Sequence, residues 1–144
     1  MNYTLITDGA YSSSRDQGGI GIVFLKDGKK ILEYSKMYKR TTNNIMELSA
    51  VIVGLRFIKK PINSLNIISD SMYVIGCITK GWKRKKNVKL WQEFDKQYSR
   101  VKELCPNITF THVKGHQSGT NLTQEAYWNK YVDKLAVCAS KQIG

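Results

Sequence analysis

The sequence predicts an α/β fold with a mixed five-stranded sheet, three strands antiparallel and two parallel, flanked by about four helices. Three observations support this prediction. Short apolar runs recur along the 144-residue chain. The pair Asp27-Gly28 separates two of them, which is a strong hairpin signal. Longer segments with helical periodicity then separate the later strands, and strands joined by helices are expected to be parallel, through right-handed crossovers.

The expected elements follow the order β-β-β-α-β-α-α-β-α. Strands are expected over residues 3–8, 20–25, 30–37, 65–69 and 108–113, with a turn at Gly18-Gly19. Helices are expected over residues 44–60, 71–79, 88–104 and 123–142. Pro61 and Pro106 close the first and third helices because proline cannot continue a helix. The length fits one domain over residues 1–144.

The composition favours a polyanionic partner. Lys and Arg number 23 against 11 Asp and Glu, which gives a net charge of +12. Three widely spaced cysteines form neither a complete disulfide framework nor a Cys-x-x-Cys metal clip, and they suggest a reducing compartment. No apolar run approaches the roughly 18 residues of a membrane span, and no signal-peptide pattern is present. We therefore expect a cytoplasmic protein without membrane contact, monomeric and without an obligate protein partner.

Four acidic residues fall on positions that periodicity assigns to buried faces. Asp8 and Asp70 end apolar strands, Glu47 begins an apolar helical stripe, and Asp133 lies on a helix face of small residues. A buried carboxylate is costly unless a cation compensates it, and no Lys or Arg falls on these faces. Because Mg²⁺ prefers carboxylate oxygens and sites form at the carboxyl ends of strands, we expect a pair of divalent ions there.

Each acid also has a simpler interpretation. Glu47 fits a capping box that begins at Asn44, and Asp70 fits a helix N-cap. Asp8 could begin a turn with Gly9, and Asp133 could pair with a surface lysine. These interpretations explain the acids one by one, but they do not explain why all four fall on core-facing positions.

Five motifs resemble type 1 ribonuclease H, in the order of that family and over essentially the whole chain. They lie at residues 6–10 with 18–21, 40–48, 69–74, 113–116 and 129–136. The resemblance implies a ribonuclease H-like fold. It also implies an endonuclease that hydrolyses the RNA strand of RNA·DNA hybrids without sequence specificity, by a two-metal-ion mechanism, leaving 3′-hydroxyl and 5′-phosphate ends.

The resemblance assigns the metal-binding catalytic carboxylates to Asp8, Glu47, Asp70 and Asp133. Two Mg²⁺ ions are implied at this site, with Mn²⁺ as an alternative ion. His116 matches the family's histidine for proton shuttling and product release, and a pKa near neutrality suits that task.

The resemblance also implies contacts with the hybrid. Arg40, Thr42 and Asn129 match a pocket that grips a phosphate of the DNA strand, while Asn43 and Asn44 match minor-groove contacts. A pocket without room for a 2′-hydroxyl would select DNA for the uncut strand, whereas the cut strand must present 2′-hydroxyls.

The chain departs from the family pattern at several positions, among them Lys130 in place of a common Glu. Met72 stands where many relatives carry Gln, and Ser14 replaces an Asn that contacts the RNA backbone. The family's long basic protrusion is contracted to a short run over residues 80–89, with six cations and no acid. Cations beside an aromatic residue suit a nucleic-acid backbone, although a solvated loop is the alternative. The residues expected to contact substrate there are Trp82, Lys83, Arg84, Lys85 and Lys86.

Two other functions remain open on sequence grounds. One is a DNA-directed nuclease of the same fold, such as a transposase or resolvase, against which residues 40–47 argue. The other is a non-catalytic nucleic-acid-binding relative, against which the retention of all four acids argues.

Overall fold

A computed structural model describes residues 2–115 and 123–143. The elements have the expected order and types. They are β1 (Asn2–Ser12), β2 (Gln17–Lys26), β3 (Lys29–Lys39), α1 (Asn43–Arg56), β4 (Ser64–Ser69), α2 (Met72–Thr79), α3 (Val88–Leu104), β5 (Asn107–His112) and α4 (Gln124–Ser140). Among the described residues, no helix has the length and apolar character needed to span a membrane.

The five strands form one sheet in the order β3-β2-β1-β4-β5. β1 pairs antiparallel with β2, and β2 pairs antiparallel with β3. β4 lies parallel to both β1 and β5, as expected for strands joined through helices. The predicted mixed sheet is therefore confirmed, and β1 lies at its centre.

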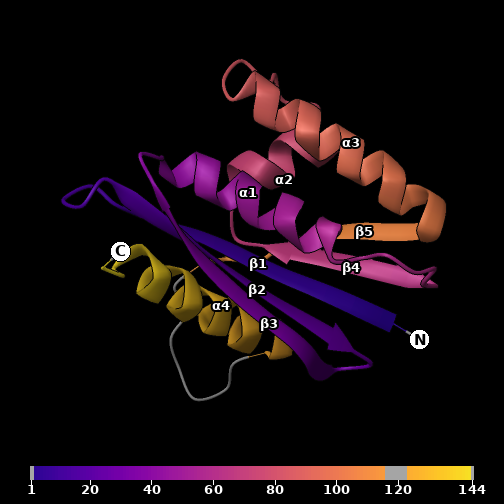
Figure 1. Cartoon of the computed structure of the whole chain (residues 1–144). Helices are drawn as coiled ribbons and strands as arrows, with labels where there is room; N and C mark the ends of the chain where they lie inside the picture. The colour runs from indigo at the N-terminus through magenta and orange to yellow at the C-terminus, as the bar shows by residue number, and fades with distance from the viewer. Residues whose placement is uncertain (1, 116–122, 144) are drawn as a thin grey trace.

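Two apolar cores lie on opposite faces of the sheet. Figure 1 shows α1 and α3 over one face and α4 against the other. Because side chains alternate along a strand, neighbouring residues of β1 serve different cores. Leu5 packs in the larger core with residues of α1 and α3, whereas Ile6 packs in the smaller core with Val132 of α4. A residue of β1 that continues the Ile6 series, such as Asp8, therefore lies on the α4 side.

The expected turn at Gly18-Gly19 is wrong, because both glycines lie inside β2. The chain reverses instead over residues 13–16, where Asp16 has a φ of +46°. A Cβ on Gly19 would lie 2.3 Å from the backbone oxygen of Ala136. The glycine therefore permits α4 to approach the strand closely, a long-range requirement that a local turn pattern does not reveal.

Helix α1 ends at Arg56, four residues before the expected end at Lys60. The side chain of Arg100 on α3 provides a reason. Its two terminal nitrogens donate to the carbonyl oxygens of Leu55 and Ile58 at 2.9 and 2.7 Å. Carbonyls at a helix end need such partners, and this distant arginine supplies them at the point where the helix stops.

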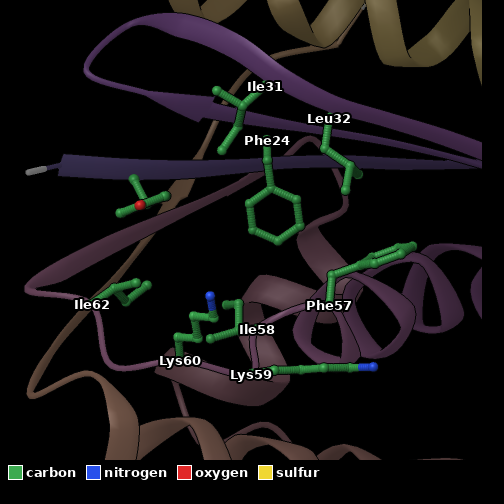
Figure 2. Close-up of a pocket in the computed structure, with 9 residues that line it drawn as sticks. Phe24, Ile31, Leu32, Phe57, Ile58, Lys59, Lys60 and Ile62 are labelled. Atoms are coloured by element: carbon green, nitrogen blue, oxygen red, sulfur yellow. The ribbon is translucent and has the colours of Figure 1, made fainter.

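An apolar hollow of about 270 Å³ lies where β1 begins, between the sheet and the end of α1. Figure 2 shows Phe24 of the sheet facing this hollow, with Phe57 and Ile58 on the α1 side and Lys59 and Lys60 beside them. The hollow is lined by residues near the start of β1 and the end of α1. It therefore lies apart from the carboxyl ends of β1 and β4.

Candidate active site

Three carboxylates from separate elements converge at one edge of the sheet. Asp8 lies on β1, Glu47 on α1 and Asp70 directly after β4. One oxygen from each lies within 4.8 Å of the other two. The neighbouring parallel strands bring Asp8 and Asp70 to the same edge, and the packing of α1 on β1 adds Glu47. Asp8 and Glu47 are buried, with exposed fractions of 3% and 7%.

Gly9 lets α1 come close enough to place Glu47 in this cluster. A Cβ on Gly9 would lie 2.4 Å from the backbone nitrogen of Glu47, a distance that real Cβ atoms do not reach. The Gly9 N–H donates to Glu47 Oε1 at 2.6 Å and to Asp8 Oδ1 at 2.9 Å. The backbone N–H of Gly9 therefore orients both carboxylates.

The capping-box interpretation of Glu47 is wrong. Helix α1 is capped by Thr42, whose Oγ1 accepts from the N–H of Ile45 at 3.2 Å. Glu47 reaches across to Gly9 on β1 instead of back to its own helix start. The sequence pattern placed the cap two residues too late.

The simpler interpretations of Asp8 and Asp70 are also wrong. Gly9 pairs with Ile20 inside the sheet, so Asp8 does not begin a turn. The N-cap of α2 is Ser71, whose Oγ accepts from the N–H of Val74 at 3.2 Å. Asp70 therefore does not cap the helix. It accepts instead from Nδ2 of Asn129, at 3.4 Å, on its Oδ2.

Asp133 of α4 lines the same cavity as the other three acids. The cavity has a volume of about 470 Å³ and a predominantly polar wall. Its lining residues are Asp8, Gly9, Ala10, Tyr11, Asn43, Glu47, Asp70, Gly115 and Asp133. None of the ion pairs between described residues involves Asp133, so it has no surface lysine as a partner there. The four predicted carboxylates thus share one cavity, with Asp133 outside the compact group of three.

The electrostatics of the cluster favour cations. Burial raises the pKa of Asp8 far above its usual range, and the neighbouring Glu47 raises it further. Burial also raises the pKa of Glu47, to about 7, against the opposing effect of hydrogen bonds from Asp8 and Gly9. No Lys or Arg is among the groups that shift either pKa. The cluster therefore offers hard oxygen ligands that hold protons in the absence of a cation and can exchange them for divalent cations such as Mg²⁺.

The residues expected to contact the DNA strand lie partly together. Asn43 lines the cavity, and the neighbouring Thr42 and Asn44 are exposed at the start of α1. Arg40 is exposed too, with a φ of +54°, and its N–H donates to the carbonyl oxygen of Asp16 at 2.8 Å. This group therefore forms a polar surface beside the carboxylates.

Asn129 lies elsewhere, on α4 one turn before Asp133. It is only 4% exposed, and its amide nitrogen is directed to Asp70. Its Oδ1 is buried without a hydrogen-bond partner among the described residues. No hydrogen bond between described residues links it to Arg40 or Thr42. The structure therefore groups Asn129 with the carboxylates and not with the expected phosphate pocket.

Two further predicted contacts among the described residues are not part of the cavity lining. Ser14 is exposed in the turn between β1 and β2, where its hydroxyl lies 3.3 Å from that of Ser12. Met72 begins α2 with an exposed fraction of 37%. His116 lies outside the described residues.

The basic run over residues 80–89 contains exposed lysines and one arginine that contacts other side chains. Lys83, Lys85 and Lys86 are exposed. Arg84 donates to both carboxylate oxygens of Asp95, at 2.8 and 2.9 Å, and stacks on the ring of Trp91 at 4.3 Å. Arg84 therefore holds the loop against α3, while the three lysines remain available for a polyanion.

Trp82 has a structural contact that the sequence did not suggest. A Cβ on Gly76 would lie 2.2 Å from the Trp82 ring, so the indole packs directly on the α2 backbone. Its exposed fraction is still 45%, which leaves ring surface for a ligand.

Tyr11 is a cavity residue that was not predicted from the sequence. Its signal was the period-2 alternation of β1, which places Tyr11 on the same face as Gly9 and hence towards α1. The pattern could have been followed two residues beyond Gly9, but the strand was expected to end at Asp8.

Comparison with known proteins gives one consistent family. The family model described as RNase H matches residues 1–141. A ribonuclease H from Trichodesmium erythraeum is 37% identical, over 97% of this chain and 89% of its own length. A ribonuclease H from Desulforamulus reducens is 38% identical, over 96% of this chain and 87% of its own length.

Solved structures show the same fold. An N-terminal RNase H domain from Mycobacterium tuberculosis, solved as a fusion with maltose-binding protein, has a TM-score of 0.77 at 21% identity and covers 96% of this chain and 93% of its own. LC11-RNase H1, solved in complex with an RNA/DNA hybrid, has a TM-score of 0.73 at 25% identity and covers 95% of each chain.

Proposed function

The chain belongs to the ribonuclease H family, and on that premise we propose that its carboxylate cavity hydrolyses the RNA strand of RNA·DNA hybrids with two divalent metal ions. The observation that carries the proposal is the convergence of Asp8, Glu47 and Asp70 within 4.8 Å, with Asp133 in the same cavity. The hybrid bound to the solved LC11-RNase H1 supports the choice of substrate.

The four acids would hold the ions between them. Asp8, on the central strand, would be shared, Glu47 and Asp70 would bind on the leaving-group side, and Asp133 would bind on the side of the attacking water. When bound, two Mg²⁺ ions would activate a water on one side of the phosphorus and stabilise the leaving oxygen on the other. The Gly9 N–H keeps Asp8 and Glu47 oriented. Asn129 does the same for Asp70.

Substrate selection follows from the surface beside the cavity. Arg40 and Thr42 would grip a phosphate of the DNA strand, and Asn43 and Asn44 would follow the minor groove. Asn129, expected in the same pocket, is 4% exposed and donates to Asp70. None of these groups reads a base in the major groove, so recognition is expected to be independent of sequence. His116 is proposed to move protons, and the products would carry 3′-hydroxyl and 5′-phosphate ends.

A cleavage assay tests this function. Labelled RNA·DNA hybrid, double-stranded RNA and double-stranded DNA are incubated with and without Mg²⁺. Wild type should cut only the hybrid and only with the metal, and end-labelling should reveal 5′-phosphates. The variant Asp8→Asn should be inactive because it removes the shared ligand. Glu103→Gln, which removes an exposed carboxylate on α3, is the charge-matched control and should stay active.

The competing functions give different results in the same assay. Cleavage of double-stranded DNA would favour a DNA-directed nuclease, and binding without cleavage would favour a non-catalytic relative. Hybrid cleavage that survives Asp8→Asn would remove the metal-site mechanism. The monomeric state and the cytoplasmic location stay predictions, and sedimentation analysis checks the first.

A further inference from the structure

Tyr11 forms one wall of the carboxylate cavity. It lines the cavity together with Asp8 and Glu47 and is half-buried. The residue opposite it in the sheet is Gly18, which carries no side chain. A Cβ on Gly18 would lie 2.5 Å from Cγ of Met46, so the Met46 side chain occupies the space over Gly18. Tyr11 therefore supplies the only side chain of this cross-strand pair at the cavity.

The Tyr11 hydroxyl has a defined direction. It donates its proton to Oδ1 of Asp16 at 3.0 Å. This hydrogen bond also raises the pKa of the Tyr11 phenol, so the group stays protonated. A phenol that donates its only proton still has a lone pair that can accept a hydrogen bond. The oxygen is thus set up as an acceptor for an incoming hydroxyl donor.

Asp16 is itself fixed in position. It has a φ of +46°, and its carbonyl oxygen accepts from the N–H of Arg40 at 2.8 Å. The side chain of Asp16 therefore orients Tyr11, while its backbone holds the start of the segment that leads to α1. Figure 1 shows the β1–β2 hairpin extending past the start of α1. One residue thus connects the cavity wall to the polar surface proposed for the other strand.

We infer that Tyr11, oriented by Asp16, is a sugar contact of the cleaved strand, and that its phenol oxygen accepts a hydrogen bond from a ribose 2′-hydroxyl next to the cut bond. The inference rests on the proposed function, because the cut phosphodiester must enter the cavity that Tyr11 lines. A 2′-hydroxyl is the donor that RNA has and DNA lacks. Neither a methyl group nor a deoxyribose could satisfy the same acceptor.

A sugar scan combined with a hydroxyl deletion tests the contact. The parent substrate is a hybrid whose cut strand consists entirely of ribose nucleotides. In each further substrate one ribose is replaced by deoxyribose. The ratio kcat/KM is measured for wild type and Tyr11→Phe on every substrate. We expect Tyr11→Phe to lower kcat/KM on the all-ribose strand by roughly two- to tenfold, the range of one neutral hydrogen bond.

The decisive quantity is the coupling between the two deletions. At one sugar position the loss from Tyr11→Phe should disappear once the ribose is replaced, because both changes remove the same hydrogen bond. At the other positions the two losses should multiply. Tyr3→Phe removes a hydroxyl from the opposite end of β1, and it should show no coupling at any position.

Two variants of Asp16 keep the test valid if Tyr11→Phe folds poorly. Asp16→Asn retains an acceptor oxygen for the Tyr11 proton and should keep the coupling, whereas Asp16→Ala should lower it. If the enzyme is active and the losses from Tyr11→Phe and from ribose replacement multiply at every sugar position, the Tyr11 contact is wrong but the proposed function is not. A wild type that leaves the all-ribose hybrid intact overturns the proposed function and the contact together.

Discussion

Burial of the Glu47 carboxyl should make the stability of the metal-free protein depend on pH. Burial raises the pKa of Glu47 from an ordinary value of 4.5 to about 7 in the folded chain. The folded state therefore binds more protons than the unfolded state between these values. It follows that the free energy of unfolding falls as pH rises from about 5 to about 8 in metal-free protein.

Thermal melting in a chelating buffer measures this effect. Asp8→Asn should flatten the pH dependence and stabilise the metal-free protein at pH 8, by roughly 1–3 kcal/mol, because a neutral amide replaces a carboxyl whose pKa burial raises far above its unfolded value. Added Mg²⁺ should raise Tm more at pH 8 than at pH 6, since the ion competes with protons. Equal pH profiles for wild type and Asp8→Asn would mean that folding does not raise the pKa of Asp8.

Asn129 gives a second prediction for a single residue. Its amide nitrogen donates to Asp70, so Asn129→Ala should leave that carboxylate less well oriented. We expect an Mg²⁺ affinity about tenfold weaker by calorimetry, at the lower end of the range of about 10–100-fold known for hydrogen-bond partners of metal ligands. Asn44→Ala, an exposed amide on α1, is the matched control. Unchanged affinity in Asn129→Ala would exclude an orienting role and favour contact with the substrate.

The acids could be predicted from the sequence because burial and polarity conflict locally. A charged residue at a core-facing position is visible from periodicity alone, as with Asp8 and Glu47. The partner of each acid could not be found in this way. The bond from Gly9 to Glu47 joins residues 38 positions apart, and that from Asn129 to Asp70 spans 59. Such contacts depend on how elements pack, which the local pattern does not contain.

At the scale of elements, glycines in β2 set how closely the helices pack. A Cβ on Gly19 would lie 2.3 Å from the backbone oxygen of Ala136, and backbone cannot rotate away. Gly19→Ala should therefore push α4 off the sheet and destabilise the protein by about 1–3 kcal/mol or more. Chemical denaturation measures the loss. Gly28→Asn, at a turn position with a φ of +84°, should cost less because Asn tolerates that conformation.

Element types were easier to predict than element ends. The helix over residues 88–104 ends as expected, because a proline follows closely. Helix α1 stops five residues before Pro61, where Arg100 from another helix binds the carbonyl oxygens of Leu55 and Ile58 around the helix end. The turn expected at Gly18-Gly19 failed for the same kind of reason. The two glycines allow helices to pack closely on β2. In the local sequence, such a glycine pair cannot be distinguished from one that forms a turn.

The basic loop should separate into binding and structural parts under mutation. Replacing Lys83, Lys85 and Lys86 with Ala should reduce the salt dependence of hybrid binding without changing Tm, since the three are exposed. Arg84→Ala should lower Tm instead, because it loses the contacts to Asp95 and Trp91.

A matched charge change provides the control for the loop. Lys29, Lys59 and Lys60 lie towards the opposite end of the sheet from the carboxylate cavity, and their replacement with Ala should alter hybrid binding less. Fluorescence anisotropy over a salt series measures both triple variants. Equal slopes for the two would show that the loop does not face the hybrid.

For the whole molecule, the net charge of +12 acts in two opposite ways. The ion pairs among the described residues involve only three of the cations, so self-repulsion is widespread. Added NaCl screens that repulsion and should raise Tm of the free protein slightly. The same salt should weaken hybrid binding steeply, by about 10³–10⁵ between about 50 and 200 mM if six to ten phosphates are contacted. Melting and anisotropy on one salt series therefore test whether the positive surface serves substrate binding. A binding constant that resists salt, beside a Tm that rises, would assign the charge to another role.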